Sequence, residues 1–346
     1  MRTDELDFHL PPELIAQTPS PRRDASKLLH YQRADRAVAH RRFSDLPGLL
    51  RPGDLLVFND ARVLPARFML RKSTGGRIEG LFLSEIRPGT WNVMLKGLER
   101  YGSAPLLFEL APEIPAYVTR SGLGGEYELQ VQTDEPAAAI LARVGRMPLP
   151  PYIKRDKGHD ERDDLDRARY QTVFARTPGA VAAPTAALHF SDELLAALAA
   201  ANVARAFVTL DVGLGTFKPV TAQDLESHVM HVEPYSITQQ TADALNQARQ
   251  AGRRIIAVGT TAARVLESQP PGEPFAATSA TTGIFIRPPY SWKHVDALIT
   301  NFHLPRSTLI ALVAAMTGLE EQRRLYRLAI DERYRFFSYG DSMFIE

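Results

Sequence analysis

The chain has 346 residues, a length typical of two domains or of one large domain with an insertion. It contains no cysteine, which excludes disulfides and any cysteine-ligated metal or iron–sulfur site. Its 41 basic and 40 acidic side chains leave a net charge of +1, which argues against non-specific nucleic-acid binding through counterion release. The charged N-terminal segment and the short apolar runs predict a soluble, cytoplasmic protein without a membrane span.

The N-terminal part combines a basic segment with one strand. Residues 21–42 carry seven arginines or lysines against two aspartates. Such a segment most often forms a solvated surface, and contact with an RNA backbone is the functional alternative. Residues 54–59 are apolar and follow the turn Pro52-Gly53, which predicts a buried strand.

The next part consists of short β-rich runs that follow Gly-Gly or Pro-Gly turns, at residues 77–83, 91–95 and 126–132. Regularly spaced short strands without helical stretches predict a small antiparallel barrel. The proline-rich residues 147–152 then form a stiff, extended connector. We therefore expect an inserted β-barrel domain at residues 65–151, within a larger domain made of residues 1–64 and 152–346.

Strands alternate with helices in the rest of the chain, apart from the highly charged residues 159–169, which we expect to form a mobile surface loop. This alternation predicts an α/β domain with a largely parallel or mixed sheet. The expected strands are 204–210, 254–258 and 295–300, and the expected helices are 238–251, the one that follows 254–258, and two capped by Ser191 and Ser307.

Three of the expected strands end in polar loops, at residues 210–219, 258–264 and 300–307. Open α/β sheets bind ligands at the carboxyl ends of their strands, so these loops predict one pocket suited to a nucleoside or a carboxylate. Taken singly, each loop could be a tight turn or a packed loop. The first lacks the third glycine of a dinucleotide fingerprint and contains Pro219, which argues against a Rossmann NAD site. Candidate ligand-binding residues here are Gly213, Gly215, Thr216, Phe217, Gly259, Thr260, Thr261, Arg264, Asn301 and Arg306.

Histidines supply most of the catalytic candidates. His189 precedes the Ser191 cap and His303 lies in the third loop, where hydrogen bonds within the fold are the alternative role. His228 and His231 could share one helical face and, with Glu233, hold a metal, but they lack the spacing of zinc hydrolases and we expect no metal. The aromatic segment 334–341 has two possible roles. It could belong to the core and form a salt bridge, or its side chains could stack on a base or face a sulfonium cation.

Taken together, these motifs resemble the S-adenosylmethionine:tRNA ribosyltransferase-isomerase family of queuosine biosynthesis. The matching stretches follow the family's order over nearly the whole chain, and residues 68–145 match least. Asp211 stands where the family often has histidine, so a scheme with an obligatory imidazole at this position does not fit. Ala187 and Leu214 also depart from the family, which often has glycine and alanine there. The matching stretches are residues 6–11, 53–67, 147–152, 170–174, 178–186, the three loops, 228–231 and 334–345.

The resemblance implies a large α/β domain with an inserted barrel, and it implies a reaction. The ribosyl part of S-adenosylmethionine is transferred to 7-aminomethyl-7-deazaguanine at the tRNA wobble position and isomerised, which gives epoxyqueuosine and releases adenine and methionine. S-adenosylmethionine is then a consumed co-substrate, no separate cofactor is expected, and we expect a monomer. A sulfonium acidifies the neighbouring C5′ hydrogens, so the site needs a base of near-neutral pKa, and the departing adenine needs an acid. Our catalytic candidates are His189, Asp211, His228, His231 and His303, and Thr185, Tyr339 and Asp341 join the binding candidates.

Two other classes of function stay open from the residues alone. The first is a non-enzymatic RNA-binding protein that uses the barrel, although this would leave the three polar loops of the other domain unexplained. The second is a metal-dependent hydrolase that uses His228 and His231, which a metal assay would distinguish.

Overall fold

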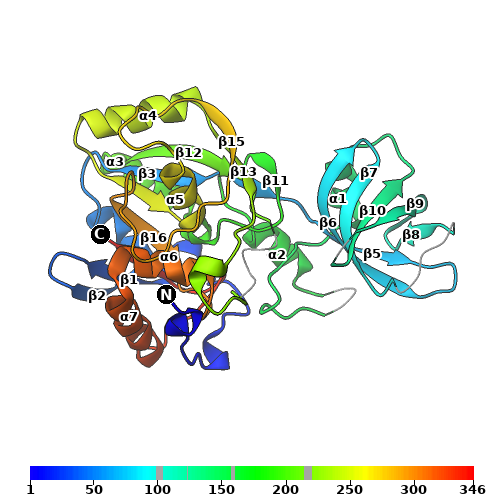
Figure 1. Ribbon diagram of the computed structural model, residues 1–346, viewed down its shortest axis with the longest axis horizontal. Coiled ribbons are helices and arrows are strands. Elements are labelled where there is room, and N and C mark those ends of the chain that lie inside the picture. Colours follow the sequence, from blue (N-terminus) through cyan, green and yellow to red (C-terminus); the bar gives the residue numbers. More distant parts are fainter. Residues whose placement is uncertain (99–103, 123, 157–159, 214–219) are drawn as a thin grey trace.

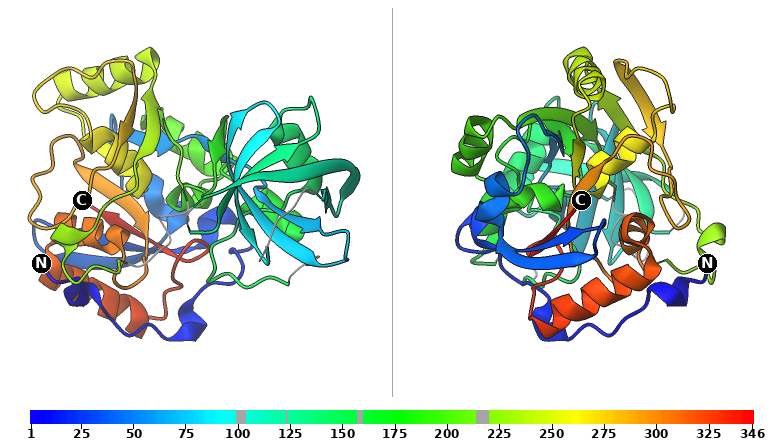
Figure 2. Two further views of the ribbon diagram at one scale, coloured as in Figure 1. Left: turned by 45° about the vertical axis from the view of Figure 1, so that its right-hand side comes forward. Right: turned by 90° about the vertical axis from the view of Figure 1, so that its left-hand side faces the viewer.

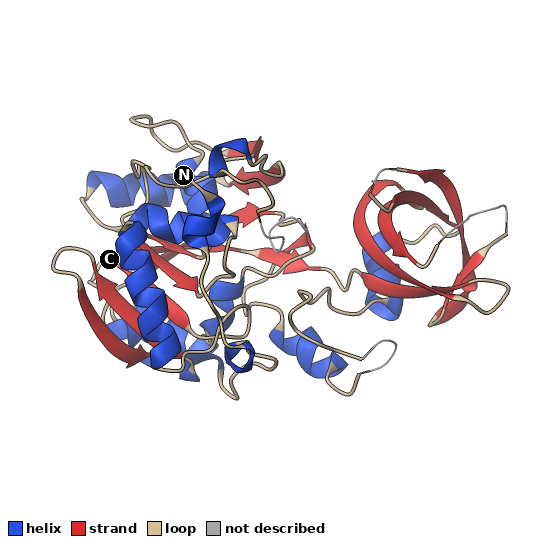
Figure 3. Ribbon diagram, turned by 60° about the horizontal axis from the view of Figure 1, so that its bottom comes forward, coloured by secondary structure: helices blue, strands red, loops and turns tan. Residues whose placement is uncertain are grey.

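The computed structural model describes residues 1–98, 104–122, 124–156, 160–213 and 220–346. It shows an α/β domain with a β-barrel standing beside it (Figures 1 and 3). The expected fold class, a large mixed-sheet domain with an inserted antiparallel barrel, is confirmed. The expected boundaries at residues 64/65 and 151/152 stay a prediction.

The larger domain is built on a nine-stranded sheet with the order β15-β13-β12-β3-β14-β16-β17-β1-β2. The neighbours β12, β3, β14 and β16 are all parallel to one another, whereas β13, β15, β17 and β2 bring in antiparallel pairs. The strands are β1 (Lys27–Gln32), β2 (Ala37–Arg42), β3 (Leu55–Asn59), β12 (Ala204–Leu210), β13 (Glu233–Ile237), β14 (Ile255–Val258), β15 (Thr278–Thr282), β16 (Ala297–Asn301) and β17 (Ser342–Ile345).

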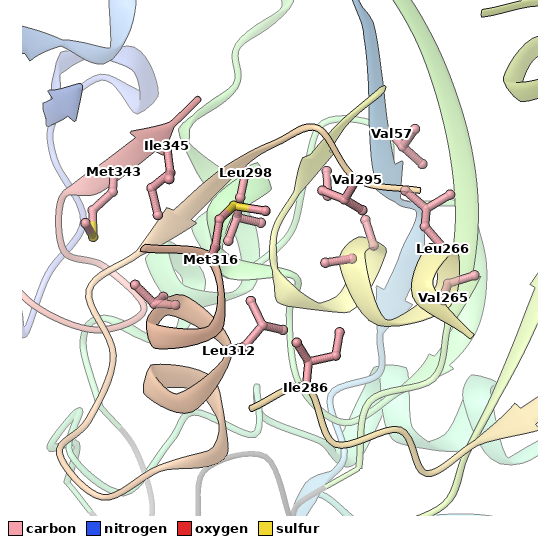
Figure 4. Close-up of a cluster of buried hydrophobic side chains, with 14 of the residues drawn as sticks. Val57, Val265, Leu266, Ile286, Val295, Leu298, Leu312, Met316, Met343 and Ile345 are labelled. Carbon is pink, nitrogen blue, oxygen red and sulfur yellow. The ribbon is translucent and has the colours of Figure 1, made fainter. Parts of the chain in front are cut away.

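Helices cover both faces of this sheet, and alternate residues of the buried strand β3 contact the two layers. Leu55 and Val57 belong to the core that includes α4 (Gln239–Gln250), α5 (Thr260–Glu267), α6 (Thr308–Thr317) and α7 (Leu319–Asp331). Figure 4 shows Val57, Leu266 and Leu312 within this core. Leu56 and Phe58 pack with α3 (Asp192–Ala200) on the other face. The central strands are therefore buried on both sides, as parallel strands generally are.

The predicted helix ends are also confirmed. The Ser191 and Ser307 hydroxyls accept hydrogen bonds from the backbone N–H groups of Leu194 and Ile310, which caps α3 and α6. Gly318 ends α6 with φ +85°, a conformation that favours glycine. Of the helices in the described ranges, none combines the length and the apolar character needed to cross a bilayer.

The barrel is closed by β10-β7-β6-β5-β8-β9, and all of these pairings are antiparallel (Figure 2). Trp91, Phe68 and Phe108 are fully buried in its interior. Its strands are β5 (Arg67–Arg71), β6 (Arg77–Arg87), β7 (Thr90–Lys96), β8 (Leu106–Phe108), β9 (Ala111–Ser121) and β10 (Glu126–Val131). One helix, α1 (Ala137–Val144), follows the last of the predicted strands and adds Ile140 and Leu141 to the barrel core.

The charged segment 159–169 was expected to be a mobile loop, and this is wrong for the part that the structure describes. Asp163–Arg169 form α2, which lies between the two domains in Figure 1. Asp166 is buried, pairs with Arg155 and accepts a hydrogen bond from the hydroxyl of Tyr339. Asp166 therefore faces the interior, whereas Glu161, Asp164 and Arg167 remain exposed. Nearby, β11 (Thr177–Ala180) pairs with β4 (Ala61–Val63) in a small separate sheet.

Candidate active site

The three strands expected to end in polar loops lie in one parallel set. Because β12, β14 and β16 run the same way, their carboxyl ends, Leu210, Val258 and Asn301, lie at one edge of the sheet. The order also places β3 between β12 and β14, so a fourth loop, which begins at Asn59, enters the same edge. This edge is the candidate site.

Asn59 and Asp60 are the residues that sequence reasoning missed. The Asn59 side chain donates to the Leu210 carbonyl at 3.0 Å and accepts from the Leu210 N–H at 3.1 Å. Asp60 accepts a 2.7 Å hydrogen bond from the hydroxyl of Thr209. Both side chains fix the end of β12 against β3. A polar pair at the carboxyl end of a buried strand was the signal that could have identified them.

Asp211 follows β12 and faces other carboxylates. Burial, together with the charges of Asp60 and Glu233, raises the pKa of Asp211 above its ordinary value. Its Oδ1 atom is buried and has no hydrogen-bond partner among the described residues. A Cβ atom at Gly179 would lie only 2.9 Å from this oxygen, so the absence of a side chain at Gly179 makes room for the carboxyl. Asp211 is thus a carboxyl group with one uncommitted oxygen.

Glu233 and Arg264 form a buried ion pair beside Asp211. Their side chains are 5% and 7% exposed, and the guanidinium Nη1 donates to Oε2 of Glu233. The other oxygen of Glu233 accepts a 2.9 Å hydrogen bond from the N–H of Gly213, so the pair anchors the loop after β12 to α5. Arg306, by contrast, is exposed, with φ +56°.

The structure does not arrange His228 and His231 on a helical face, because residues 228–232 have no regular secondary structure. His228 is half-buried, with its ring 5.6 Å from that of Phe285, and His231 is exposed. Both line a pocket with Glu233 and Arg264. Within the described ranges, no three His, Asp or Glu side chains are grouped so that they could hold a metal.

His189 lies at the other end of this edge, beside Asn301 of β16. Its Nδ1 lies 2.8 Å from the hydroxyl of Ser26, and its Nε2 lies 3.2 Å from Nδ2 of Asn301. Burial, helped by the nearby charges of Arg335 and Arg23, lowers the pKa of His189 to about 3. The imidazole is therefore neutral at physiological pH. It lines a second pocket, together with Arg23, Arg169 and Tyr339.

Several other candidates have roles in the fold. Asp341 accepts hydrogen bonds from the N–H groups of Lys27 and Arg335, at 2.9 and 2.8 Å, and the Tyr339 hydroxyl is bonded to Asp166. His303 is buried, and its Nε2 lies 2.7 Å from the hydroxyl of Thr300 at the end of β16. These contacts fit the structural roles that the sequence left open as alternatives to a role in the reaction.

The second loop begins at Gly259, whose N–H donates to the Ile299 carbonyl at 2.7 Å and whose φ of +90° is a conformation that favours glycine. Thr260 and Thr261 are buried in the first turn of α5, and the Thr261 hydroxyl has no partner among the described residues. Thr185 begins a short 3₁₀ turn that ends at His189. The candidates Gly215, Thr216 and Phe217 lie outside the described residues.

His303 yields a prediction for acid stability. Burial lowers its pKa from the ordinary 6.5 to about 3, so below pH 6.5 the unfolded chain binds a proton that the folded chain does not. Stability should therefore fall as pH drops from 6.5 toward 3, and this histidine should contribute about 2 kcal/mol of the loss between pH 7.5 and 5.

The measurement is urea unfolding at pH 7.5 and 5. His303→Gln should show a smaller difference between the two pH values than the unmodified chain. The exposed His9→Gln serves as the control and should keep the full difference. An unchanged difference in His303→Gln would show that the buried imidazole does not set the acid sensitivity.

The fold and this edge define an α/β protein with a polar site at the carboxyl ends of its parallel strands and a barrel inserted after β4. Residues 3–345 match the family model described as "Queuosine biosynthesis protein". The chain therefore belongs to the queuosine biosynthesis family of S-adenosylmethionine:tRNA ribosyltransferase-isomerases, as the sequence motifs indicated.

Named relatives agree over their full length. The chain is 48% identical to the S-adenosylmethionine:tRNA ribosyltransferase-isomerase of Anaeromyxobacter sp., with 100% of this chain and 99% of that protein covered. It is also 48% identical to that of Thermus thermophilus, with 99% of each covered. A crystal structure of S-adenosylmethionine tRNA ribosyltransferase from Thermotoga maritima matches with a TM-score of 0.55 at 33% identity, covering 99% of this chain and 100% of that one.

Proposed function

We propose that this chain transfers and isomerises the ribosyl moiety of S-adenosylmethionine onto 7-aminomethyl-7-deazaguanine at the tRNA wobble position. The products are epoxyqueuosine in tRNA, adenine and methionine. The observation that carries this proposal is the 48% identity over complete lengths to proteins named for this activity. We further propose that the enzyme acts as a monomer in the cytoplasm.

The test is incubation with S-adenosylmethionine and tRNA that bears the deazaguanine precursor, followed by mass spectrometry of the nucleosides. Adenine and methionine should appear in step with epoxyqueuosine, and only when the precursor tRNA is present. Formation of S-adenosylhomocysteine would mean methyl transfer and would contradict the proposal. Binding of the tRNA without any turnover would favour a non-enzymatic RNA-binding protein.

Within this reaction we assign the base to Asp211. The sulfonium acidifies the C5′ hydrogens, and a base of raised pKa can accept one of them near neutral pH. Among the described residues, Oδ1 of Asp211 has no hydrogen-bond partner, and burial together with the charges of Asp60 and Glu233 raises the pKa of this carboxyl above its ordinary value. This explains how a carboxyl group can stand where the family often has histidine.

The two buried histidines receive different assignments. His189 lines a pocket and is held by Ser26 and Asn301, so we propose that it orients a substrate as a neutral imidazole. The low pKa of His189, about 3, argues against its use as the base. His303 is bonded within its own loop, and we place it in the support of the site instead of in the reaction centre.

Activity is expected to survive exhaustive treatment with EDTA. Among the described residues, Glu233 is committed to Arg264 and Gly213, which leaves His228 and His231 without a third ligand. The measurement is epoxyqueuosine formation before and after chelation, with magnesium restored separately so that tRNA folding is controlled. Loss of activity that zinc alone restores would instead support the metal-dependent hydrolase class.

A further inference from the structure

Arg264 of α5 has one edge of its guanidinium without a partner. Nη1 donates to Glu233, but Nε and Nη2 are buried and have no hydrogen-bond partner among the described residues. Donors of a charged group that are left unpaired in the interior are unfavourable, and native structures rarely retain them without a reason. An acceptor supplied by a ligand would satisfy both atoms.

In two other arginines of this protein, the Nε and Nη2 atoms together bind a carboxylate. Nε of Arg155 lies 2.6 Å from one oxygen of Asp166, and Nη2 lies 2.9 Å from the other. Arg254 binds both oxygens of Asp54 through the same two nitrogens. The Nε–H and Nη2–H groups are parallel and match the spacing of carboxylate oxygens, so the free edge of Arg264 fits a carboxylate.

The surroundings of Arg264 indicate which carboxylate fits. Arg264 and Glu233 line a pocket whose other walls include the apolar side chains of Ile284, Phe285 and Leu312. Apolar walls suit a short aliphatic chain better than they suit the charged backbone of a polynucleotide. The Arg264 side chain is also only 7% exposed, which favours one small ligand group over a surface phosphate.

We propose that Nε and Nη2 of Arg264 bind the α-carboxylate of the methionine moiety of S-adenosylmethionine. This inference rests on the proposed function and adds the part of the substrate that the residue recognises. Glu233 then acts as a positioning residue, because its bond to Nη1 turns the free edge of the guanidinium toward the ligand. Methionine, as the released product, would occupy the same place.

The test compares equilibrium binding of S-adenosylmethionine and of decarboxylated S-adenosylmethionine, without tRNA, to three proteins. The unmodified chain should bind the carboxylated compound about 10- to 100-fold more tightly, the effect of losing a bidentate charged hydrogen bond. Arg264→Gln should bind both compounds equally. Arg254→Gln is the matched control, since it also breaks a buried ion pair but has both nitrogens occupied by Asp54, and it should keep the preference.

Three results would overturn the inference. One is equal binding of the two compounds by the unmodified chain, a comparison that does not depend on whether Arg264→Gln folds. Another is an Arg264→Gln protein that keeps the preference but loses affinity for tRNA, because the edge would then bind phosphate. The last is failure of the unmodified chain to bind S-adenosylmethionine at all, which would overturn the proposed function as well.

Discussion

Replacing Asp211 with asparagine is expected to slow the first turnover by about 10²- to 10⁴-fold, the usual contribution of a general base. The amide keeps the size of the side chain but cannot accept the C5′ proton at its oxygen near neutral pH. The measurement is the single-turnover rate of adenine release at saturating S-adenosylmethionine and precursor tRNA. Asp243→Asn, an exposed aspartate on α4, is the matched control and should leave the rate unchanged.

The pH profile distinguishes a base from a residue that only shapes the pocket. The carboxylate is the active form, so the rate should rise with pH through the raised pKa of Asp211. Asp211→His restores the residue that the family often has, and it should recover turnover with the rise moved to the range of an imidazole. An Asp211→Asn rate within severalfold of the unmodified enzyme would remove this residue from the mechanism.

Replacing Glu233 with alanine is expected to lower the free energy of unfolding by about 3–5 kcal/mol, because a buried Arg264 charge loses its partner. The N–H of Gly213 loses its acceptor at the same time. The measurement is urea unfolding at pH 7.5. Glu226→Ala is the control: its side chain is 48% exposed and pairs with Arg287, so its loss should cost no more than about 1 kcal/mol.

A double variant tests whether the unpaired charge of Arg264 causes this loss of stability. In Glu233→Ala with Arg264→Leu, the unpaired charge is gone, so part of the lost stability should return. If Glu233→Ala alone is as stable as Glu226→Ala, the pair does not hold the loop after β12, and the anchoring argument fails.

The sequence was sufficient for the elements that local patterns determine. The caps Ser191 and Ser307, the strand Ala204–Leu210 and the barrel strands predicted at 77–83, 91–95 and 126–132 carry short-range signals, and the structure confirms them. The order of the strands carries no such signal. The position of β3 between β12 and β14, which brings Asn59 and Asp60 to the site, depends on contacts with residues about 150 positions away.

For charged and polar side chains, too, local sequence does not show whether they are buried. The segment around Asp166 looks solvated in sequence, yet the Asp166 side chain is buried because Arg155 and Tyr339 reach it from other segments. His189 likewise depends on Ser26 and Asn301, which no spacing rule connects. Tertiary partners, which are distant in sequence, decide whether a polar side chain belongs to the surface or to the interior.

The position of β17 has a consequence for the order of folding during synthesis. β17 pairs with β16 on one side and with β1 on the other, so among the strands that the structure describes β1 and β2 join the central strands of the sheet only through Ser342–Ile345. The barrel strands, by contrast, lie in one continuous stretch, from β5 to β10. On the ribosome the barrel can therefore complete its pairing while much of the chain is still unmade. β1 and β2 therefore cannot pair with the central strands of the sheet until β17 has emerged. During this interval the edges of β1 and β2 are exposed and accessible to chaperones.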